Sequence, residues 1–140
     1  KWSERAMSES FLLSNMAPQV GPSFNRGIWA TLEAKVREWA IERGELYVVT
    51  GPIYTTTSLK HVGTNNVAVP THFYKVVFDP VRVEAIAFIL PNEKNPSSKL
   101  PTFITSVDEV ENKTGLDFLS TLQDDVENLV EANTAPAMWQ

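Results

Sequence analysis

The sequence predicts a single α+β domain over residues 1–140, with one prominent helix, a central mostly antiparallel sheet and helices near the C-terminus. Two observations support this fold class. A helical apolar periodicity near the N-terminus is followed by several short runs rich in β-branched and aromatic residues, and the remaining helix signals come only after those runs. Because helical and strand patterns are segregated instead of alternating, a doubly wound parallel sheet is not expected.

The first segments are short and polar. Residues 3–10 are expected to form a short helix or turn with Ser3 as its N-cap, and residues 11–13 a short buried strand. Residues 14–24 are expected to form a loop, because two prolines and a glycine interrupt them. This loop is rich in amide and hydroxyl side chains, which makes it a candidate functional segment.

The strongest helix signal covers residues 25–43. Apolar residues recur there at spacings of three and four, which places them on one face of a helix: Ile28, Leu32, Val36 and Trp39. Gly44 is a natural stop for this helix, because glycine readily adopts the backbone conformation found just after a helix end.

Three apolar runs predict the sheet. Residues 46–50 read as a strand ended by Gly51-Pro52, and residues 83–90 read as another. Residues 67–78 are also rich in strand formers, although Pro70 inside them implies a sheet edge or a bulge, since proline cannot donate a hydrogen bond to a neighbouring strand.

The C-terminal part reads as helical and acidic. Ser106-Val-Asp-Glu109 is a capping box that opens a helix, and Gly115 stops it. A second acidic helix is expected over residues 116–131 with its charges on a solvated face. Residues 134–140 show no periodicity and are expected to fray.

Composition excludes several classes of protein. With 43% hydrophobic and 21% charged residues, the chain is neither disordered nor of low complexity. No run of 18 apolar residues occurs, so no membrane span is expected. There is no cysteine, which excludes disulfides, thiol catalysis and cysteine-based zinc sites in this chain.

The charge is distributed unevenly along the chain. The net charge of −5 argues against a simple nucleic-acid coat. However, residues 1–75 hold eight Lys or Arg and six Asp or Glu, whereas residues 76–140 hold four and eleven. The first half can therefore face an anion, and the second half is not expected to lie along a phosphate backbone.

One set of polar residues on the long helix suggests chemistry. Asn25, Trp29, Glu33 and Arg37 follow each other at intervals of four and so share one side of the helix. Side-chain oxygens such as those of Asn25 and Glu33 can bind a hard cation, and a guanidinium such as that of Arg37 can bind a neighbouring phosphate. Asn25 and Glu33 are separated by about 12 Å along a straight helix axis. If Asn25 binds the metal, Glu33 would therefore hold a metal-bound water. The simpler interpretation makes Asn25 an N-cap and Glu33–Arg37 a surface ion pair.

Several blocks of sequence carry a resemblance to a known family. They are Ser10-Phe-Leu-Leu-Ser-Asn15-Met-Ala-Pro-Gln19, then Asn25, Trp29, Leu32-Glu33 and Arg37, then Tyr47-Val-Val-Thr-Gly-Pro52, Val67-Ala-Val-Pro-Thr-His-Phe-Tyr-Lys75, and finally Val107, Glu111 and Thr114-Gly-Leu-Asp-Phe118. In this order they resemble the DNA/RNA non-specific endonucleases, which are endonuclease G-like ββα-metal nucleases. The likeness covers residues 8–118.

The resemblance implies a ββα-metal nuclease fold and hydrolysis of phosphodiester bonds in DNA and RNA without sequence specificity, with Mg²⁺ or Mn²⁺ as cofactor. By this resemblance Asn25 is the direct metal ligand and Glu33 holds a metal-bound water. Arg37 lies near the phosphate, and Asn15 and Gln19 support the site. The family's general base is a histidine in an Asp-Arg-Gly-His motif.

That motif does not occur in this chain, whose first residue is not Met. The expectation is a C-terminal, metal-binding portion that is truncated or nicked before Lys1 and inactive alone. Part of the apolar face of the helix predicted over residues 25–43, including Ile28 or Trp29, would then lack residues to pack against. Its expected partners are DNA, RNA and an N-terminal fragment with the missing motif; a homodimer stays open. The alternative is a non-catalytic module that binds nucleic acid or protein. If the source is bacterial, export is favoured over a cytoplasmic location.

Neither histidine is expected to replace the missing base. His72 lies on an apolar face of its strand, which is typical of a structural histidine. His61 lies in a polar loop beside Lys60 and is expected to be solvated.

Overall fold

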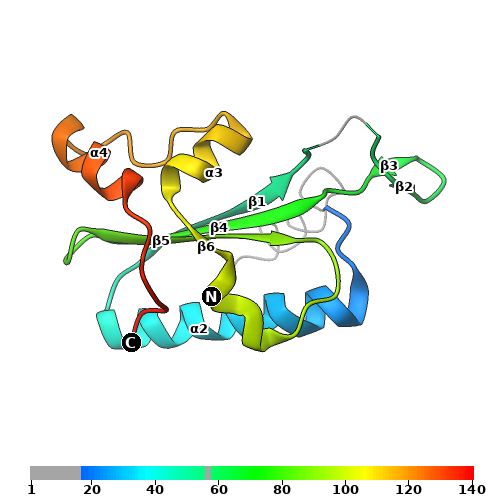
Figure 1. The fold of residues 1–140 in the computed structure, drawn as a ribbon, viewed down its shortest axis with the longest axis horizontal. Coiled ribbons are helices and arrows are strands. Elements are labelled where there is room, and N and C mark those ends of the chain that lie inside the picture. The colour runs from blue at the N-terminus through cyan, green and yellow to red at the C-terminus, as the bar shows by residue number, and fades with distance from the viewer. Residues whose placement is uncertain (1–16, 56–57) are drawn as a thin grey trace, which may run out of the picture.

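The computed structural model describes residues 17–55 and 58–140. A four-stranded antiparallel sheet separates one long helix from two shorter helices (Figure 1). This arrangement confirms the predicted α+β class with a central antiparallel sheet. The expected helix or turn at residues 3–10 and the strand at 11–13 lie outside the described residues. No helix in the described ranges is long and apolar enough to cross a membrane.

The long helix begins earlier than its apolar periodicity predicts. A π-helical segment, η2 (Gly21–Ile28), leads into the α-helix α2 (Trp29–Arg43). The loop expected at residues 14–24 is therefore wrong from Gly21 onward. Proline in the first turn is compatible with a helix start, because the first backbone N–H groups need no helical partner. Gly27 breaks the helical geometry at the junction, with φ −105° and ψ −116°.

The main sheet has the strand order β1 (Tyr47–Ile53), β4 (His72–Asp79), β5 (Glu84–Pro91) and β6 (Ile104–Thr105), and every neighbouring pair is antiparallel. A separate ribbon pairs β2 (His61–Val62) with β3 (Val67–Ala68). The three predicted strand regions are thus confirmed, with two changes at prolines.

Both changes follow from where each proline lies. Strand β1 continues through Gly51 and Pro52 to Ile53, because only one of its edges pairs with a neighbouring strand in the described chain. A proline is tolerated on such an edge strand. Pro70, in contrast, lies in a buried break that separates β3 from β4. Strand β4 itself is central and contains no proline.

The C-terminal helices are partly as expected. Ser106 caps α3 (Val107–Thr114), its hydroxyl accepting a hydrogen bond of 3.1 Å from the N–H of Glu109, and Gly115 ends the helix with φ 73°. The second helix, α4, covers only Asp124–Ala132, so the helix expected from residue 116 is wrong in its first half. There the N–H of Phe118 donates to a Glu111 carboxylate oxygen at 3.0 Å, a tertiary bond that competes with helical pairing.

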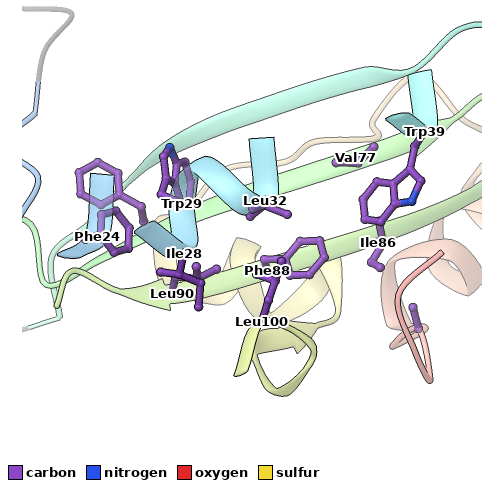
Figure 2. Close-up of a cluster of buried hydrophobic side chains, with 12 residues drawn as sticks. Phe24, Ile28, Trp29, Leu32, Trp39, Val77, Ile86, Phe88, Leu90 and Leu100 are labelled. Atoms are coloured by element: carbon purple, nitrogen blue, oxygen red, sulfur yellow. The ribbon is translucent and has the colours of Figure 1, made fainter. Parts of the chain in front are cut away.

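The face of the sheet toward α2 holds the larger core (Figure 2). Aromatic and branched side chains from η2, α2, β4 and β5 interlock there: Phe24, Ile28, Trp29, Leu32, Trp39, Phe73, Val77, Ile86, Phe88 and Leu90. Trp39 and Phe88 are both buried in this core. Ile28 and Trp29 are only 0% and 3% exposed, so the expectation that they would lack neighbours is wrong.

The opposite face packs against α3 and α4. Its core joins alternate residues of β4 and β5 to both helices: Tyr74, Val76, Phe78, Ala85, Ala87, Val107, Val110, Leu119 and Val130. Alternation of side chains along β4 supplies both cores, because consecutive residues of a strand point to opposite faces. The long helix and the acidic helices are therefore separated by the sheet (Figure 1).

The C-terminal tail is ordered by contacts with α2, which contradicts the expected fraying. The indole N–H of Trp39 donates to the carbonyl of Trp139 at 3.0 Å. The guanidinium carbon of Arg43 lies 3.8 Å from the centroid of the Trp139 ring, and Ala135 is buried in the core. These contacts link residues about a hundred positions apart, so no local periodicity could reveal them.

Candidate active site

An open cleft of about 580 Å³ lies where the start of the long helix meets strand β1. Residues of the 17–19 segment, η2, β1 and β4 line it: Ala17, Pro18, Gln19, Asn25, Thr50, Gly51, Pro52 and Phe73. The structure therefore brings together two residues predicted for the site, Gln19 and Asn25. Asn15, the other supporting residue, lies outside the described part of the chain.

Asn25 is positioned by η2 and not by a helix N-cap. Its backbone N–H donates to the carbonyl of Val20 at 3.0 Å, and Val20 is the residue that precedes the helical segment. The simpler interpretation of Asn25 as an N-cap is therefore wrong. Its side chain is exposed and lines the cleft.

Glu33 and Arg37 lie further along α2 and are exposed. Neither lines the cleft, and they do not form the surface ion pair with each other that the simpler interpretation required. On this part of α2 the pair is instead Lys35 with Glu38, at 3.0 Å. The backbone break at Gly27 lies between Asn25 and Glu33, so the two are not joined by one straight helix.

A buried lysine lies next to the cleft wall. Lys75, on the α2-facing side of β4, is only 6% exposed. Its ammonium donates to the hydroxyl of Thr50 at 2.7 Å and lies 4.8 Å from the centroid of the Trp29 ring. Burial lowers the pKa of Lys75, while the negative charge of Glu33 opposes this shift. The ammonium is therefore held under the cleft wall that Thr50 forms.

Sequence reasoning missed the role of Lys75, although a signal was present. A lysine at the centre of the apolar strand Phe73 to Phe78 must either reach solvent or be buried with partners. Whether the lysine is solvated or buried depends on the neighbouring strand. Pairing of β1 with β4 places Thr50 opposite Lys75, where its hydroxyl accepts the hydrogen bond.

Asn92 was also missed, and it organises the loop that carries Gln19. Its side-chain oxygen accepts from Val20 N–H at 2.9 Å, and its amide nitrogen donates to the carbonyls of Pro18 and Pro70, each at 3.0 Å. The side chain is only 9% exposed. It therefore satisfies the buried carbonyl of Pro70 and two partly buried backbone groups, those of Val20 and Pro18. A single asparagine after a strand carries no signal of this role in sequence.

Gly51 forms part of the cleft wall, and a residue with a larger side chain would not fit at this position. It pairs in register with Tyr74, and a Cβ atom at Gly51 would lie 2.6 Å from the Tyr74 hydroxyl oxygen. The glycine in the Thr-Gly-Pro sequence thus permits close approach of a buried tyrosine ring to the strand.

The histidines lie elsewhere. His72 is half-buried on the α3-facing side of β4, and its Nδ1 lies 2.9 Å from the Thr71 hydroxyl. Burial, followed by the charge of Lys113, lowers its pKa, as expected for a structural histidine. His61 is exposed in β2, not in a loop, and it lines a neighbouring cleft of about 510 Å³ that also contacts Gln19. Neither histidine lines the cleft that contains Asn25.

Chemically, the cleft offers amide and hydroxyl oxygens above a buried ammonium. Such oxygens can ligate a hard cation, and the nearby positive charge favours an anionic ligand. Among the described residues that line the cleft, none is an acid or a base. These residues can therefore bind and orient a charged ligand.

The sequence of this chain is similar to those of known nucleases. The sequence profile of the DNA/RNA non-specific endonuclease family matches residues 1–125. Nuclease C1 of Cunninghamella echinulata is 40% identical over 129 residues, which cover 84% of this chain and 51% of that protein. The mitochondrial endonuclease G of Caenorhabditis elegans is 36% identical, with 95% of this chain and 47% of that protein covered.

A solved structure is similar as well. A chain from the crystal structure of an EndoG/EndoGI complex superposes with a TM-score of 0.76 at 35% identity, covering 86% of this chain and 54% of that chain. The chain spans about half the length of the relatives it matches. Family profile, sequence identity and fold thus agree, and the chain belongs to the DNA/RNA non-specific endonuclease family.

Proposed function

We propose that this chain supplies the metal-binding and phosphate-facing part of an enzyme that hydrolyses phosphodiester bonds in DNA and RNA without sequence specificity. The observation that carries the proposal is the cleft that joins Asn25 to Gln19 and Thr50. Its described wall combines apolar residues with the polar side chains of Gln19, Asn25 and Thr50, and we assign these polar groups to the ion and the phosphate. Contacts to backbone phosphates give affinity without sequence information.

The proposed cofactor is Mg²⁺, with Mn²⁺ as a substitute. The donor chemistry fits, because the amide oxygen of Asn25 lies at the cleft together with a hydroxyl and a second amide. When bound, such an ion would supply positive charge for the phosphate and the leaving oxygen. Asn25 would hold it, and Glu33 would orient a bound water from α2. Lys75 would keep Thr50 in place through the hydrogen bond between them.

The distribution of charge supports a nucleic-acid substrate at this face. The helices that carry most of the acidic second half, α3 and α4, pack on the opposite face of the sheet (Figure 1). On the cleft side, η2 and α2 expose Arg26, Lys35 and Arg37 together with an equal number of acids, Glu33, Glu38 and Glu42. Arg37 would contact a phosphate, since its planar guanidinium matches phosphate oxygens. The net charge of −5 therefore comes mainly from surfaces other than the one that the substrate would meet.

We further propose that the general base comes from a polypeptide segment outside this chain, as in an N-terminal fragment of the same protein. Strand β1 provides a place for such a segment. Three of its consecutive residues are unusually exposed for apolar side chains, Tyr47 at 57%, Val48 at 43% and Val49 at 40%. Within the described chain its outer edge pairs with no strand. An added strand would satisfy these backbone groups.

The test is a plasmid-nicking assay of residues 1–140 with Mg²⁺, with and without a polypeptide that carries an Asp-Arg-Gly-His motif. We expect cleavage only when the polypeptide is added, because the attacking water needs a base within hydrogen-bond reach. Cleavage by the chain alone that is lost in His61→Ala or His72→Ala would instead assign the base to that histidine. Nucleic-acid binding that persists in EDTA, without cleavage in either mixture, would favour the non-catalytic module.

A further inference from the structure

Five carboxylates gather between α3 and α4, on the sheet face opposite the cleft. Asp108 and Glu111 come from α3, Asp117 from the connection that follows, and Glu127 and Glu131 from α4. They form two overlapping triads that share Glu131, and within each triad the carboxylate oxygens lie within 4.8 Å of one another. Carboxylates this close repel each other unless a positive charge or protons lie between them.

Glu131 is the unusual member of this cluster, because it is buried and one of its carboxylate oxygens has no partner. Its side chain is only 6% exposed, and its Oε1 makes no hydrogen bond. An unsatisfied buried carboxylate oxygen carries a large desolvation cost. Both triads include this residue, so its carboxylate points into the cluster and not away from it. The sequence prediction of a solvated acidic face is wrong at this position.

No cation of the described chain neutralises the cluster. None of the five carboxylates forms an ion pair with another described residue, and the nearby Lys113 pairs with Glu109, at 3.8 Å, on α3. Burial and then the charges of Glu111 and Glu127 raise the pKa of Glu131 to about 7. The pKa values of Glu111 and Glu127 are also raised, first by burial and then by other carboxylates, although the N–H of Phe118 partly opposes the shift at Glu111.

We propose that this cluster is a calcium site, in which Asp108, Glu111 and Glu131 ligate one Ca²⁺ between α3 and α4. Ca²⁺ takes six to eight oxygen ligands at roughly 2.3–2.6 Å, so opposite ligands lie up to roughly 5 Å apart. The three oxygens lie within 4.8 Å of one another, close enough to share one ion. Ca²⁺ accepts flexible coordination by several carboxylates, whereas Mg²⁺ demands near-ideal octahedral geometry and keeps several of its waters. A site built from carboxylates of two helices therefore suits Ca²⁺ better.

The proposed ion would stabilise the packing of the two helices. Asp108 and Glu111 lie one turn apart on α3, and Glu131 lies in the last turn of α4, so one ion would tie both helices together. This site is separate from the cleft at Asn25, since the sheet lies between α2 and the two acidic helices. Glu131 and Glu127 also lie beyond residues 1–125, which the family profile matches.

The proposal is tested by calorimetric titration of CaCl₂ into the 140-residue chain, after dialysis against EGTA and then chelator-free buffer. We expect one bound Ca²⁺ per chain and an affinity for MgCl₂ at least tenfold weaker. Glu131→Gln and Asp108→Asn should each weaken calcium binding at least tenfold. Glu109→Gln removes one acid from the same helix outside both triads and should leave calcium affinity unchanged. Asn25→Ala should leave it unchanged too, which separates this site from the cleft.

Thermal unfolding gives a second measurement, in which the original chain and Glu131→Gln should differ both with and without calcium. At a hundredfold excess of free Ca²⁺ over its Kd, the midpoint of the original chain should rise by roughly 5 °C or more. In EGTA, Glu131→Gln should melt higher than the original chain, because it removes a repelled buried charge, but it should no longer respond to calcium. Asp108→Asn changes an exposed residue and tests the site even if Glu131→Gln fails to fold.

Three results would overturn the proposal. The first is that the titration shows no heat of binding at millimolar CaCl₂. The second is equal calcium affinity in Glu131→Gln, Asp108→Asn and Glu109→Gln. The third is that Mg²⁺ binds as tightly as Ca²⁺, which would contradict the proposed selectivity of the site for Ca²⁺.

Discussion

The side-chain oxygen of Asn92 accepts a hydrogen bond of 2.9 Å from the N–H of Val20, although the two residues are 72 positions apart. This bond fixes the point at which η2 begins, because Val20 directly precedes that helical segment. Through its other bonds Asn92 also holds Pro18 beside Gln19. The end of strand β5 thus positions the residues that form one wall of the cleft.

We expect Asn92→Ala to lower the free energy of unfolding by about 2–3 kcal/mol, since it removes three hydrogen bonds and leaves the buried Pro70 carbonyl without this partner. Urea unfolding would measure the loss. Asn95→Ala is the control, because that asparagine lies in the following loop and forms none of these bonds. Equal stability of both variants would show that the loop holds its place without Asn92.

Asn25→Ala should abolish Mg²⁺-dependent cleavage in the reconstituted enzyme while the fold stays intact. The side chain is exposed and makes no packing contribution to the core, so the thermal midpoint should stay within about 2 °C of the original. Metal affinity is measured by calorimetry and cleavage by plasmid nicking. Normal cleavage at ordinary Mg²⁺ concentrations would remove Asn25 from the site.

Glu33→Gln should slow cleavage roughly 10–100-fold, because a residue that orients a metal-bound water contributes in that range. Glu38→Gln is a matched control: it lies on the same helix, is also exposed and pairs with Lys35. Initial rates of both variants would be compared at saturating Mg²⁺. If the two rates agree, Glu33 has no special role and is an ordinary surface acid.

Lys75→Met should retain the fold, because methionine can pack beside Trp29 and the apolar strand residues, and replacement of a buried charge by an apolar group is often nearly neutral. Thr50 would lose its 2.7 Å hydrogen bond at the cleft wall, so cleavage should fall roughly tenfold. Lys99→Met, at an exposed position, is the control. A cleavage rate equal to that of the control would assign Lys75 to the fold alone.

Acid stability should depend on Asp79, which is fully buried at the end of β4. Burial alone would raise its pKa, but hydrogen bonds from the backbone and side chain of Arg82, from Arg43 and from the N–H of Val81 lower the pKa to about 2. Since the ordinary value is 3.8, the carboxylate stabilises the fold above about pH 4. That stability is lost as the pH falls through 2.

Asp79→Asn should therefore lower the free energy of unfolding at pH 7 by on the order of 2 kcal/mol, since it weakens hydrogen bonds to a charged group. Its stability should also vary less between pH 4 and pH 2 than that of the original chain. Denaturant unfolding at several pH values would measure both effects. An unchanged pH dependence would mean that other carboxylates control acid unfolding.

Local patterns in the sequence determined much of the fold. The apolar periodicity of α2, the stop at Gly44 and the capping box at Ser106 each depend on residues within a few positions, and each is confirmed. The strand regions followed in the same way from short β-rich runs. The resemblance placed the chain in its family, which the family profile and the similar structures confirm. The assigned roles of Asn25, Glu33 and Arg37 stay predictions.

Contacts between distant residues decided the rest. The start of η2 depends on Asn92, the order of the tail depends on Trp39 and Arg43, and the burial of Lys75 depends on Thr50 across a strand pair. Glu131 shows the reason most clearly: its helix is acidic in sequence, and only the packing of α4 against α3 turns one of those acids inward. Burial and polar partnership are properties of several segments together, so no single stretch of sequence specifies them.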